Sequence, residues 1–409
     1  MIREQDTITA IATPFGESAI GIIRLSGPDA IKIAGKIFYP YKKINLRNAL
    51  SHSIIYGKIK DKKQIIDNVL VLLMKNPGSY TGEDSIEISA HGNPLILNKI
   101  LNLLLNNGAR LAMPGEFTKR AFLNGKIDLL QAESVLDIIH AKTQKALDAS
   151  LRQLTGEASN KFSDISNCLM DLLMHLEIDI DFTEENIPSL TQKQYESQIK
   201  NIISQIKLFI DSYDITQLLR QGINIVITGA PNTGKSSLLN AILKTSVAIV
   251  TDIPGTTRDA LLCPINLNGF PCNIIDTAGL RDAEDFIEKQ GIEKTKEHIK
   301  RSHIVLFLCD ASREFSQEEK KEFKKILELE KEKNIIVGIN KIDILNTKHV
   351  REIKEFFKDI YVIEFSAKTL ENISVLEQKI VEAITHGQIS FTADFMINIR
   401  HKNILENIL

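Results

Sequence analysis

The chain has 409 residues, a length that indicates two or three domains rather than one compact core. Its composition, 43% apolar and 25% charged, is typical of globular proteins and excludes a wholly disordered chain. The four cysteines share no CxxC spacing, so neither a zinc ribbon nor a disulfide framework is predicted. The N-terminus has no apolar signal segment, and no apolar run is long enough to cross a bilayer. We therefore expect a cytoplasmic protein without a membrane anchor.

Charge is unevenly distributed along the chain. Residues 1–120 carry a net charge of +6, residues 121–215 carry −7, and the remainder carries −1. A basic first segment suits anionic ligands or RNA phosphates, although ordinary surface charge gives the same count. The sequence leaves both interpretations open.

Short apolar runs between turn residues predict an α+β domain over residues 1–120. A helix is expected from Pro94, a residue favoured in a first helical turn, to Asn107, because Gly108 then ends the pattern. The expected strands are residues 21–27, 53–59, 69–78 and 85–92.

From Leu129 onward, apolar residues recur every three or four positions, which is the spacing of amphipathic helices. These stripes predict a helical domain over residues 121–215, with breaks near Gly156 and at the acidic turn 179–188. The segment 385–409 has a helical pattern as well. We interpret the stripes, at 136–154, 158–176 and 199–210, as the core of a helical bundle.

Residues 216–384 alternate buried-type strands, Gly-rich loops and helices, which predicts an α/β domain with a mostly parallel sheet. Each predicted strand ends in polar residues. Functional residues gather at the carboxyl ends of the strands in such sheets, so these polar residues are candidates for a site.

The segment from Gly229 to Ser236 fits the phosphate-binding pattern GxxxxGK[ST] between a predicted strand and a predicted helix. Its glycines let successive backbone N–H groups face a phosphate. We expect Lys235 to reach the β- and γ-phosphates and to act in catalysis, and the Ser236 hydroxyl to bind Mg²⁺. The predicted GTP-binding residues here are Asn232, Thr233, Gly234, Lys235, Ser236 and Ser237.

Three further motifs follow predicted strands. In the first, Asp276, Thr277, Ala278 and Gly279 offer a carboxylate for Mg²⁺ and a backbone N–H group for the γ-phosphate. The second, Asn340-Lys341-Ile342-Asp343, selects GTP over ATP, because the Asp343 carboxylate can accept from two adjacent donors on guanine. The third, Ser366-Ala367-Lys368, completes the base pocket. Four such motifs in this order predict a GTPase.

The segment 251–259, TDIPGTTRD, is the predicted switch loop, which must offer a threonine to the bound magnesium. We expect Thr251, Thr256 and Thr257 to contact the nucleotide, and Thr257 to bind Mg²⁺. Together with GAPNTGKSS, this loop resembles the TrmE-Era class of translation GTPases. Leu280 stands where Ras-type enzymes place a catalytic glutamine, and a leucine cannot orient water. Hydrolysis therefore needs another group to orient the attacking water.

Blocks outside the GTPase motifs resemble the MnmE (TrmE) family of tRNA modification GTPases over nearly the whole chain. Its plan inserts the GTPase domain, here 216–384, into a helical domain, so the resemblance predicts that 121–215 and 385–409 pack together. The blocks are Ala12-Thr13-Pro14, Gly21 to Arg24, Pro77 to Asp84, His91-Gly92 and Pro114 to Glu133.

The resemblance implies a homodimer that works on tRNA with the flavoprotein MnmG (GidA). Together they would add an aminomethyl or carboxymethylaminomethyl group to C5 of the wobble uridine, with a tetrahydrofolate derivative as the one-carbon donor. The family's folate contacts match Arg24, Glu83 and Lys126. Folate has a glutamate tail for cations and a pterin whose adjacent donors suit a carboxylate. Taken alone, Arg24 and Lys126 would be ordinary surface charges.

The resemblance also implies a device for hydrolysis. Asn232, Thr251, Ile253 and Thr256 match a potassium site, and K⁺ beside the phosphates can neutralise transition-state charge as an arginine finger does. Glu288 matches the residue that orients the attacking water, whereas by itself it would be a solvated acid.

Family members usually end in a Cys-x-Gly-Lys motif, which this sequence lacks. Its last cysteine, Cys309, fits a buried strand position.

One hypothesis for the function is an active enzyme that hydrolyses GTP and modifies tRNA. The alternative is a GTP-binding switch that keeps GTPase activity without the modification chemistry. An Era-like ribosome-assembly factor needs a KH-type domain, which 385–409 cannot form. A shortened tail would also leave the stripe 158–176 partly exposed.

Overall fold

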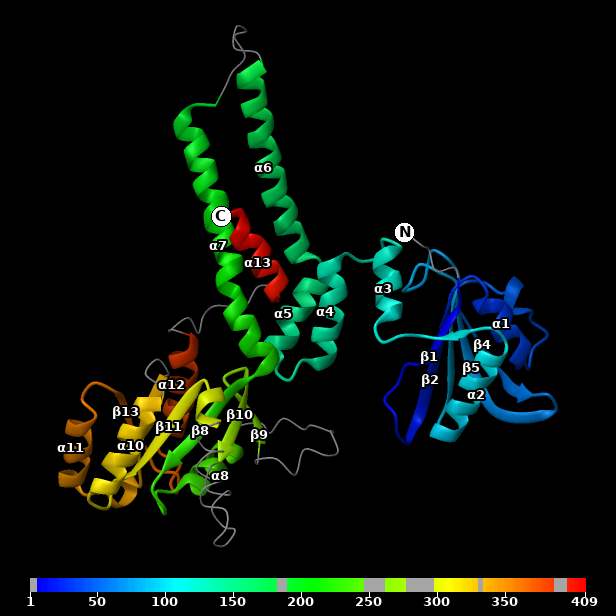
Figure 1. Ribbon diagram of the computed structural model, residues 1–409. Helices are drawn as coiled ribbons and strands as arrows, with labels where there is room; N and C mark the ends of the chain where they lie inside the picture. Colours follow the sequence, from blue (N-terminus) through cyan, green and yellow to red (C-terminus); the bar gives the residue numbers. More distant parts are fainter. Residues whose placement is uncertain (1–5, 182–189, 246–261, 277–297, 330–333, 386–395) are drawn as a thin grey trace. The chain divides into compact units, whose positions relative to one another are not determined.

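The structure is a computed structural model that describes residues 6–181, 190–245, 262–276, 298–329, 334–385 and 396–409 (Figure 1). The chain divides into two compact units, Met1–Val135 and Leu136–Leu409. Within the described ranges, every helix is too short or too polar to span a membrane.

The first unit is built on a seven-stranded sheet in the order β3-β4-β5-β6-β2-β1-β7. Neighbouring strands are antiparallel, except that β1 and β7 are parallel. Three of the four predicted strands are confirmed, whereas the one predicted at 69–78 runs from Gln64 to Met74. The strands β1, β3 and β7 span at most four residues each and are too short to give an apolar pattern. The strands are β1 (Ile8–Ile11), β2 (Ser18–Ser26), β3 (Phe38–Pro40), β4 (Ser53–Asp61), β5 (Gln64–Met74), β6 (Ser85–Gly92) and β7 (Arg110–Leu111).

Two helices cover one face of this sheet, α1 (Ala30–Ile37) and α2 (Pro94–Asn106), and α3 (Glu116–Leu123) follows β7. Helix α2 begins as predicted: Pro94 lies in its first turn, and the Asn93 side chain accepts a hydrogen bond from the Leu95 N–H group at 2.9 Å. Alternation along the strands buries Ile55 and Val71 against α1 and α2 and leaves the other face exposed.

The second unit begins with helices, of which α4, α5 and α6 follow one another after two or three residues. Helices α6 and α7 lie side by side (Figure 1), with the rings of Phe162 and Phe209 stacked at 4.4 Å. The helices are α4 (Leu129–His140), which crosses the division between the units, α5 (Gln144–Leu154), α6 (Glu157–Asp181), α7 (Gln192–Gln221) and the C-terminal α13 (Ile399–Ile408).

The C-terminal helix packs against a helix of the 121–215 segment, as the resemblance predicts. Its partner is α7, and Leu405 is buried there. The predicted stripe on α6 is only partly right. Ala158, Ile165 and Leu172 are buried, but Leu169 remains exposed.

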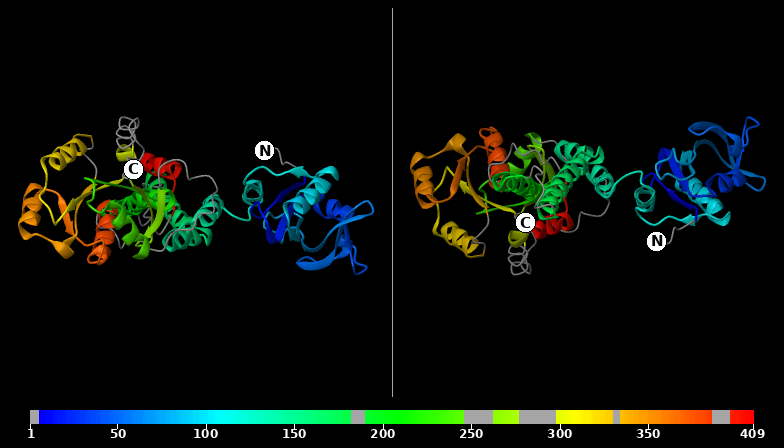
Figure 2. Two further views of the ribbon diagram at one scale, coloured as in Figure 1. Left: turned by 90° about the horizontal axis from the view of Figure 1, so that it is seen from below. Right: turned by 90° about the horizontal axis from the view of Figure 1, so that it is seen from above.

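The predicted GTPase part, residues 216–384, contains a six-stranded sheet in the order β13-β12-β11-β8-β10-β9. All neighbours are parallel except β9 and β10, so the predicted mostly parallel sheet is confirmed. Helices cover both faces: in Figure 2 the yellow α10 and the orange-red α12 lie on opposite sides of the sheet. The strands are β8 (Ile223–Gly229), β9 (Leu262–Leu267), β10 (Phe270–Asp276), β11 (Ile304–Asp310), β12 (Asn334–Asn340) and β13 (Tyr361–Glu364). The helices are α8 (Lys235–Thr245), α10 (Gln317–Leu329), α11 (Thr347–Phe356) and α12 (Ile373–Thr385).

The helical part runs directly into the sheet. Helix α7 continues to Gln221, beyond the boundary predicted at residue 216, and only Gly222 with φ 85° separates it from β8. Apolar side chains of α5 and α7 form one hydrophobic core with apolar side chains on one face of the sheet. Arg220 adds a two-bond ion pair to Asp137, at 2.5 and 2.9 Å. The carboxyl end of α7 is therefore fixed beside the strand that leads to the phosphate-binding loop.

Candidate nucleotide-binding site

The loop from Gly229 to Gly234 joins β8 to α8 and curls through left-handed backbone conformations. The φ angles are 137° at Gly229, 64° at Asn232 and 95° at Gly234. Asparagine and glycine tolerate such angles better than other residues. A Cβ atom on Gly234 would lie 2.2 Å from the side-chain nitrogen of Asn340, so only glycine fits there.

Polar side chains of the same loop fix its shape. Lys235 is buried, and its ammonium group donates to the carbonyl oxygens of Gly229 and Ala230, both at 2.8 Å. The Thr233 hydroxyl donates to the Ala230 carbonyl at 2.9 Å. Ser236 and Ser237 are exposed in the first turn of α8. A buried cation, exposed hydroxyls and a helix amino terminus form a site that can hold phosphate oxygens and a hard cation.

Asn340, at the end of β12, connects three of the predicted motifs. Its buried side chain donates to the Thr233 carbonyl at 2.9 Å. Its side-chain oxygen accepts from the backbone N–H groups of Lys341 at 2.8 Å and Ala367 at 3.0 Å. The phosphate-binding loop and both base-pocket motifs therefore meet at one amide.

Asp343 lies exposed in a short 3₁₀ turn, Ile342–Ile344, beside the last motif. One of its carboxylate oxygens accepts a hydrogen bond from the Ser366 hydroxyl at 2.7 Å. Ser366 is fully buried and also accepts from the Thr369 N–H group at 3.2 Å. The Ser366 hydroxyl thus orients the Asp343 carboxylate, which remains accessible to donors in solution. Lys368, in the same motif as Ser366, is also exposed.

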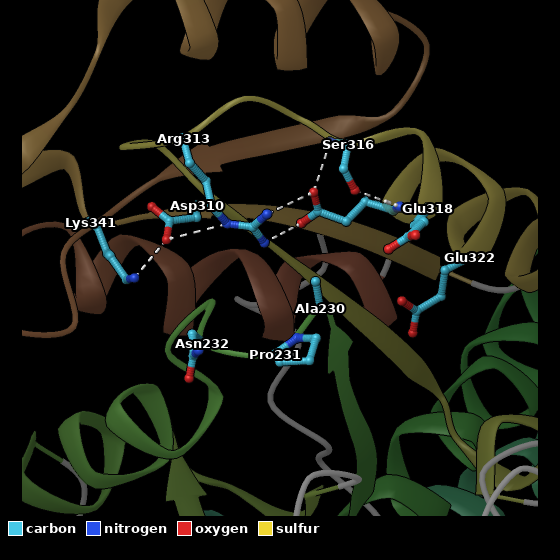
Figure 3. A pocket seen from close by; sticks show the side chains of 10 residues that line it. Ala230, Pro231, Asn232, Asp310, Arg313, Ser316, Glu318, Glu322 and Lys341 are labelled. Atoms are coloured by element: carbon cyan, nitrogen blue, oxygen red, sulfur yellow. Dashed lines mark hydrogen bonds and ion pairs between the residues drawn. The ribbon is translucent and has the colours of Figure 1, made fainter. Parts of the chain in front are cut away.

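Asp310, at the end of β11, is a site residue that the sequence motifs did not reveal. Its carboxylate lies 2.6 Å from the Lys341 ammonium group (Figure 3) and accepts from the N–H and hydroxyl groups of Ser312 at 2.9 and 2.6 Å. Burial acts to raise the pKa of Asp310, but Lys341 and Ser312 hold the pKa below its ordinary value. An ion pair to a buried carboxylate therefore fixes the lysine of the predicted base-binding motif.

A cleft of about 670 Å³ adjoins this ion pair and the phosphate-binding loop, with Pro231 and Asn232 on one wall (Figure 3). On another wall Arg313 pairs with buried Glu319 at 2.8 Å. Glu319 also accepts from the Ser316 N–H group at 2.9 Å, which caps the start of α10. The cleft thus has rigid sides and a mixture of charges.

Several predicted site residues lie outside the described part of the chain. The backbone of Asp276 ends β10 opposite Ile227 of β8, next to the strand that leads into the phosphate-binding loop. Of the predicted potassium ligands, Asn232 is described and is exposed. The side chain of Asp276 and the residues Thr251, Ile253, Thr256, Thr257, Thr277, Ala278, Gly279, Leu280 and Glu288 are not described.

The three predicted folate contacts lie around one segment of the first unit, 77–83, and the neighbouring α3. The Arg24 guanidinium pairs with Glu87 at 2.7 Å and lies over the rings of Tyr80 and Phe117, at 5.7 and 5.5 Å. Glu83 accepts from the Ser26 hydroxyl at 2.7 Å. The Lys126 ammonium group donates to the Pro77 carbonyl at 3.1 Å.

An ion-pair network beneath these residues was not predicted. Buried Arg120 binds Asp6 at 2.5 Å, Glu116 at 3.1 Å and Glu83 at 3.3 Å. Arg110 binds Glu116 at 2.6 Å and Asp6 at 2.5 Å. Burial acts to raise the pKa of Glu116, but Arg110, the Met113 N–H group and Arg120 lower it to about 2. The network joins the N-terminal segment to the segment of predicted folate contacts.

Comparison with known proteins decides the family. A family model described as the MnmE helical domain matches residues 129–409, and one described as the GTP-binding protein TrmE N-terminus matches residues 7–126. The tRNA modification GTPase MnmE of Thermoanaerobacter pseudethanolicus is 45% identical over 98% of this chain and 87% of its own length. That of Carboxydothermus hydrogenoformans is 44% identical over 99% of this chain and 88% of its own length. The chain belongs to the MnmE family.

Membership in the MnmE family confirms the GTPase predicted from the four motifs, and with it an enzyme of tRNA modification. It also decides against the Era-like interpretation. Among solved structures, a point variant of Aquifex aeolicus Era bound to GDP.AlF4− is 28% identical, covers 39% of this chain and 56% of that chain, and has a TM-score of 0.33.

Proposed function

We propose that this member of the MnmE family binds GTP with Mg²⁺ and uses its hydrolysis to modify C5 of the wobble uridine in certain tRNAs. The observation that carries the nucleotide assignment is the Asn340 amide, which links the loop at Thr233 to the base motif at Ala367. Such a link sets the distance between a phosphate site and a guanine site. Asp343 would select guanine, and Lys235 would stabilise the phosphates.

The proposed magnesium ligands are Ser236 and Thr257, with Asp276 acting through water. The exposed Ser236 hydroxyl at the amino end of α8 fits a hard cation that prefers oxygen ligands. Mg²⁺ would neutralise charge on the β- and γ-phosphates. Lys235 and the backbone N–H groups of the loop would orient the same phosphates.

For the hydrolysis step we propose a potassium ion held by Asn232 with Thr251, Ile253 and Thr256, and Glu288 as the residue that orients water. Exposed Asn232 has the left-handed backbone needed to present its side-chain carbonyl outside the loop. GTP hydrolysis should be faster in KCl than in NaCl at equal ionic strength, by about 100-fold, below the range of an arginine finger. Asn232→Ala should remove this difference while GTP binding stays. Equal rates in the two salts for the parent enzyme would refute the potassium site.

The first unit is the proposed site for a tetrahydrofolate derivative. Glu83, Arg24 and Lys126 border the segment 77–83, with the rings of Tyr80 and Phe117 against Arg24. A carboxylate would suit the donors of a pterin, and the two cations would suit the anionic glutamate tail. Folate would supply the one-carbon unit, and these residues would orient it.

The modification chemistry would require the flavoprotein MnmG as a partner, in the cytoplasm, with this chain as a homodimer. The decisive experiment is mass spectrometry of wobble uridine in tRNA from cells whose only MnmE-family protein is this chain. The carboxymethylaminomethyl or aminomethyl group should be present with the parent chain and absent with Arg24→Ala. Unmodified uridine with a parent chain that still hydrolyses GTP would instead support a switch without modification chemistry.

A further inference from the structure

Aromatic and basic side chains gather on the exposed face of β3 and β4 in the first unit, beside β5, whose Asn68 bonds to Tyr41. Tyr39, Tyr41 and Tyr56 are 43%, 53% and 54% exposed. Tyr56, Lys58 and Lys60 alternate with buried residues along β4 and so share one face, and Tyr39 lies opposite Lys58 in the register. We call these five residues the β3–β5 patch.

The patch is already ordered by its own contacts. The Tyr41 and Tyr56 rings stack with centroids 5.0 Å apart, and the Tyr41 hydroxyl donates to Asn68 at 2.8 Å. The ammonium groups of Lys58 and Lys60 lie 4.8 Å from the ring centroids of Tyr41 and Tyr39. Exposed cation–π contacts are weak, so each lysine can leave its tyrosine ring and bind an anion instead at little cost in free energy.

The charge around the patch is predominantly positive. Residues 39–63 contain seven lysines and arginines and a single acid, Asp61, so they account for the whole excess positive charge of residues 1–120. Lys42 and Lys43 follow Tyr41 directly, and Lys62 and Lys63 form the turn between β4 and β5. All four are exposed. The rings are thus bordered by cations on two sides.

We propose that the β3–β5 patch binds a single-stranded segment of RNA, with bases stacked on the tyrosines and phosphates paired with the lysines. Exposed rings on a sheet favour unpaired bases, whereas duplex RNA is recognised mainly through shape and its backbone. A second copy of the chain fits poorly, because a two-fold interface would oppose two identical positive surfaces. The RNA class rests on the proposed function, which makes tRNA the substrate and a tRNA loop the single-stranded segment.

The test measures binding of an unmodified tRNA transcript to the full chain by fluorescence anisotropy at several salt concentrations. Lys58→Glu/Lys60→Glu should weaken binding at least 10-fold and flatten the salt dependence, because fewer phosphates are neutralised. Lys32→Glu/Lys99→Glu makes the same charge change at exposed positions of α1 and α2 and should bind nearly as the parent does. Tyr41→Leu/Tyr56→Leu keeps apolar bulk and should lose about 5- to 100-fold. An unstructured oligonucleotide should compete better than a duplex of equal length.

Each outcome has a distinct meaning. If the parent binds and both pairs of charge reversals weaken it equally, only overall charge matters and the patch is refuted. If the parent hydrolyses GTP but binds no tRNA, the proposed function and the patch both fail. If the tyrosine variant binds RNA normally but changes the sedimentation coefficient, the patch is an interface between copies instead. Hydrogen exchange protection of β5 and β6, measured on every variant, shows whether the first unit remains folded, and GTP hydrolysis shows the same for the GTPase part.

Discussion

The nucleotide site and the predicted folate site are held together in different ways. In the GTPase part, backbone groups meet at one side chain: Asn340 binds the Thr233 carbonyl and the Ala367 N–H group. In the first unit, ion pairs between side chains hold the predicted site together. Arg120 joins Asp6, which is 114 positions away in the sequence, to Glu116. Backbone sites depend on glycine and on strand ends, whereas side-chain networks depend on complete charge compensation. Mutations should therefore damage the two regions by different routes.

Removal of the central cation should give the largest effect. Arg120→Met leaves the carboxylates of Asp6, Glu83 and Glu116 without their shared partner, and breaking a buried pair costs about 3–5 kcal/mol of unfolding free energy. Hydrogen exchange mass spectrometry should show lost protection in peptides of the first unit and unchanged protection in β8 and α8. Exposed Lys119→Met on the same helix is the matched control and should exchange as the parent does. Uniform loss in both units would contradict independent stability.

The ion-pair network around Arg120 is a part of the structure that the sequence could not predict. Alternating apolar runs and strand-end motifs are local, so β4, β6, β8 and the loop at Lys235 were predicted well. Asp310 ends a buried strand at the same sheet edge as Asn340, and this position could have suggested it. Arg120 gives no such signal, because its partners come from distant segments and a charged residue in a helix usually faces solvent. Burial of a cation is decided by tertiary packing.

Acid should weaken the first unit before the nucleotide site. The pKa of Glu116 is about 2 in the folded protein against 4.5 for the ordinary group, so its contribution is complete above pH 4.5 and is lost as pH falls toward 2. The shift corresponds to about 3 kcal/mol. Urea unfolding between pH 6 and pH 3, followed by hydrogen exchange, should show this loss.

The corresponding variant separates this carboxylate from general acid effects. Glu116→Gln should be less stable at pH 6 and should show a smaller decrease in stability on acidification, because the titrating group is gone. Exposed Glu17→Gln is the control and should retain the parent's acid dependence. An unchanged acid response in Glu116→Gln would remove Glu116 from the explanation.

In the backbone-built site, a single methyl group should have a strong effect. Gly234→Ala places a Cβ atom 2.2 Å from the Asn340 amide at a φ of 95°, so the loop must shift or the amide must leave. Displacement of catalytic groups by about 1 Å costs on the order of 100-fold in activity, which is near 2.7 kcal/mol. Isothermal titration with GDP and a GTPase assay should both show the loss. Gly35→Ala, where the added atom meets nothing within 4 Å, should leave both unchanged.

The smallest expected effect concerns the ion pair between Asp310 and Lys341, which brings charge compensation of the kind seen in the first unit into the nucleotide site. Asp310→Asn keeps the shape and can still accept from Ser312, but it removes the charge that fixes the Lys341 ammonium group. We expect KM for GTP to rise about 10-fold, or 1.4 kcal/mol, because a hydrogen bond between charged groups is weakened while the phosphate loop is intact. The kcat value should not change.

Base selection separates this role from that of the proposed guanine contact. Asp343→Asn should weaken GTP and improve xanthosine triphosphate, whose exchanged oxygen needs a donor, whereas Asp310→Asn should leave that preference as in the parent. Exposed Asp359→Asn controls for the loss of one negative charge and should not alter KM. A lower kcat at unchanged KM in Asp310→Asn would mean that the ion pair acts on hydrolysis rather than on binding. In that case charge compensation, and not backbone geometry alone, would control both regions of the molecule.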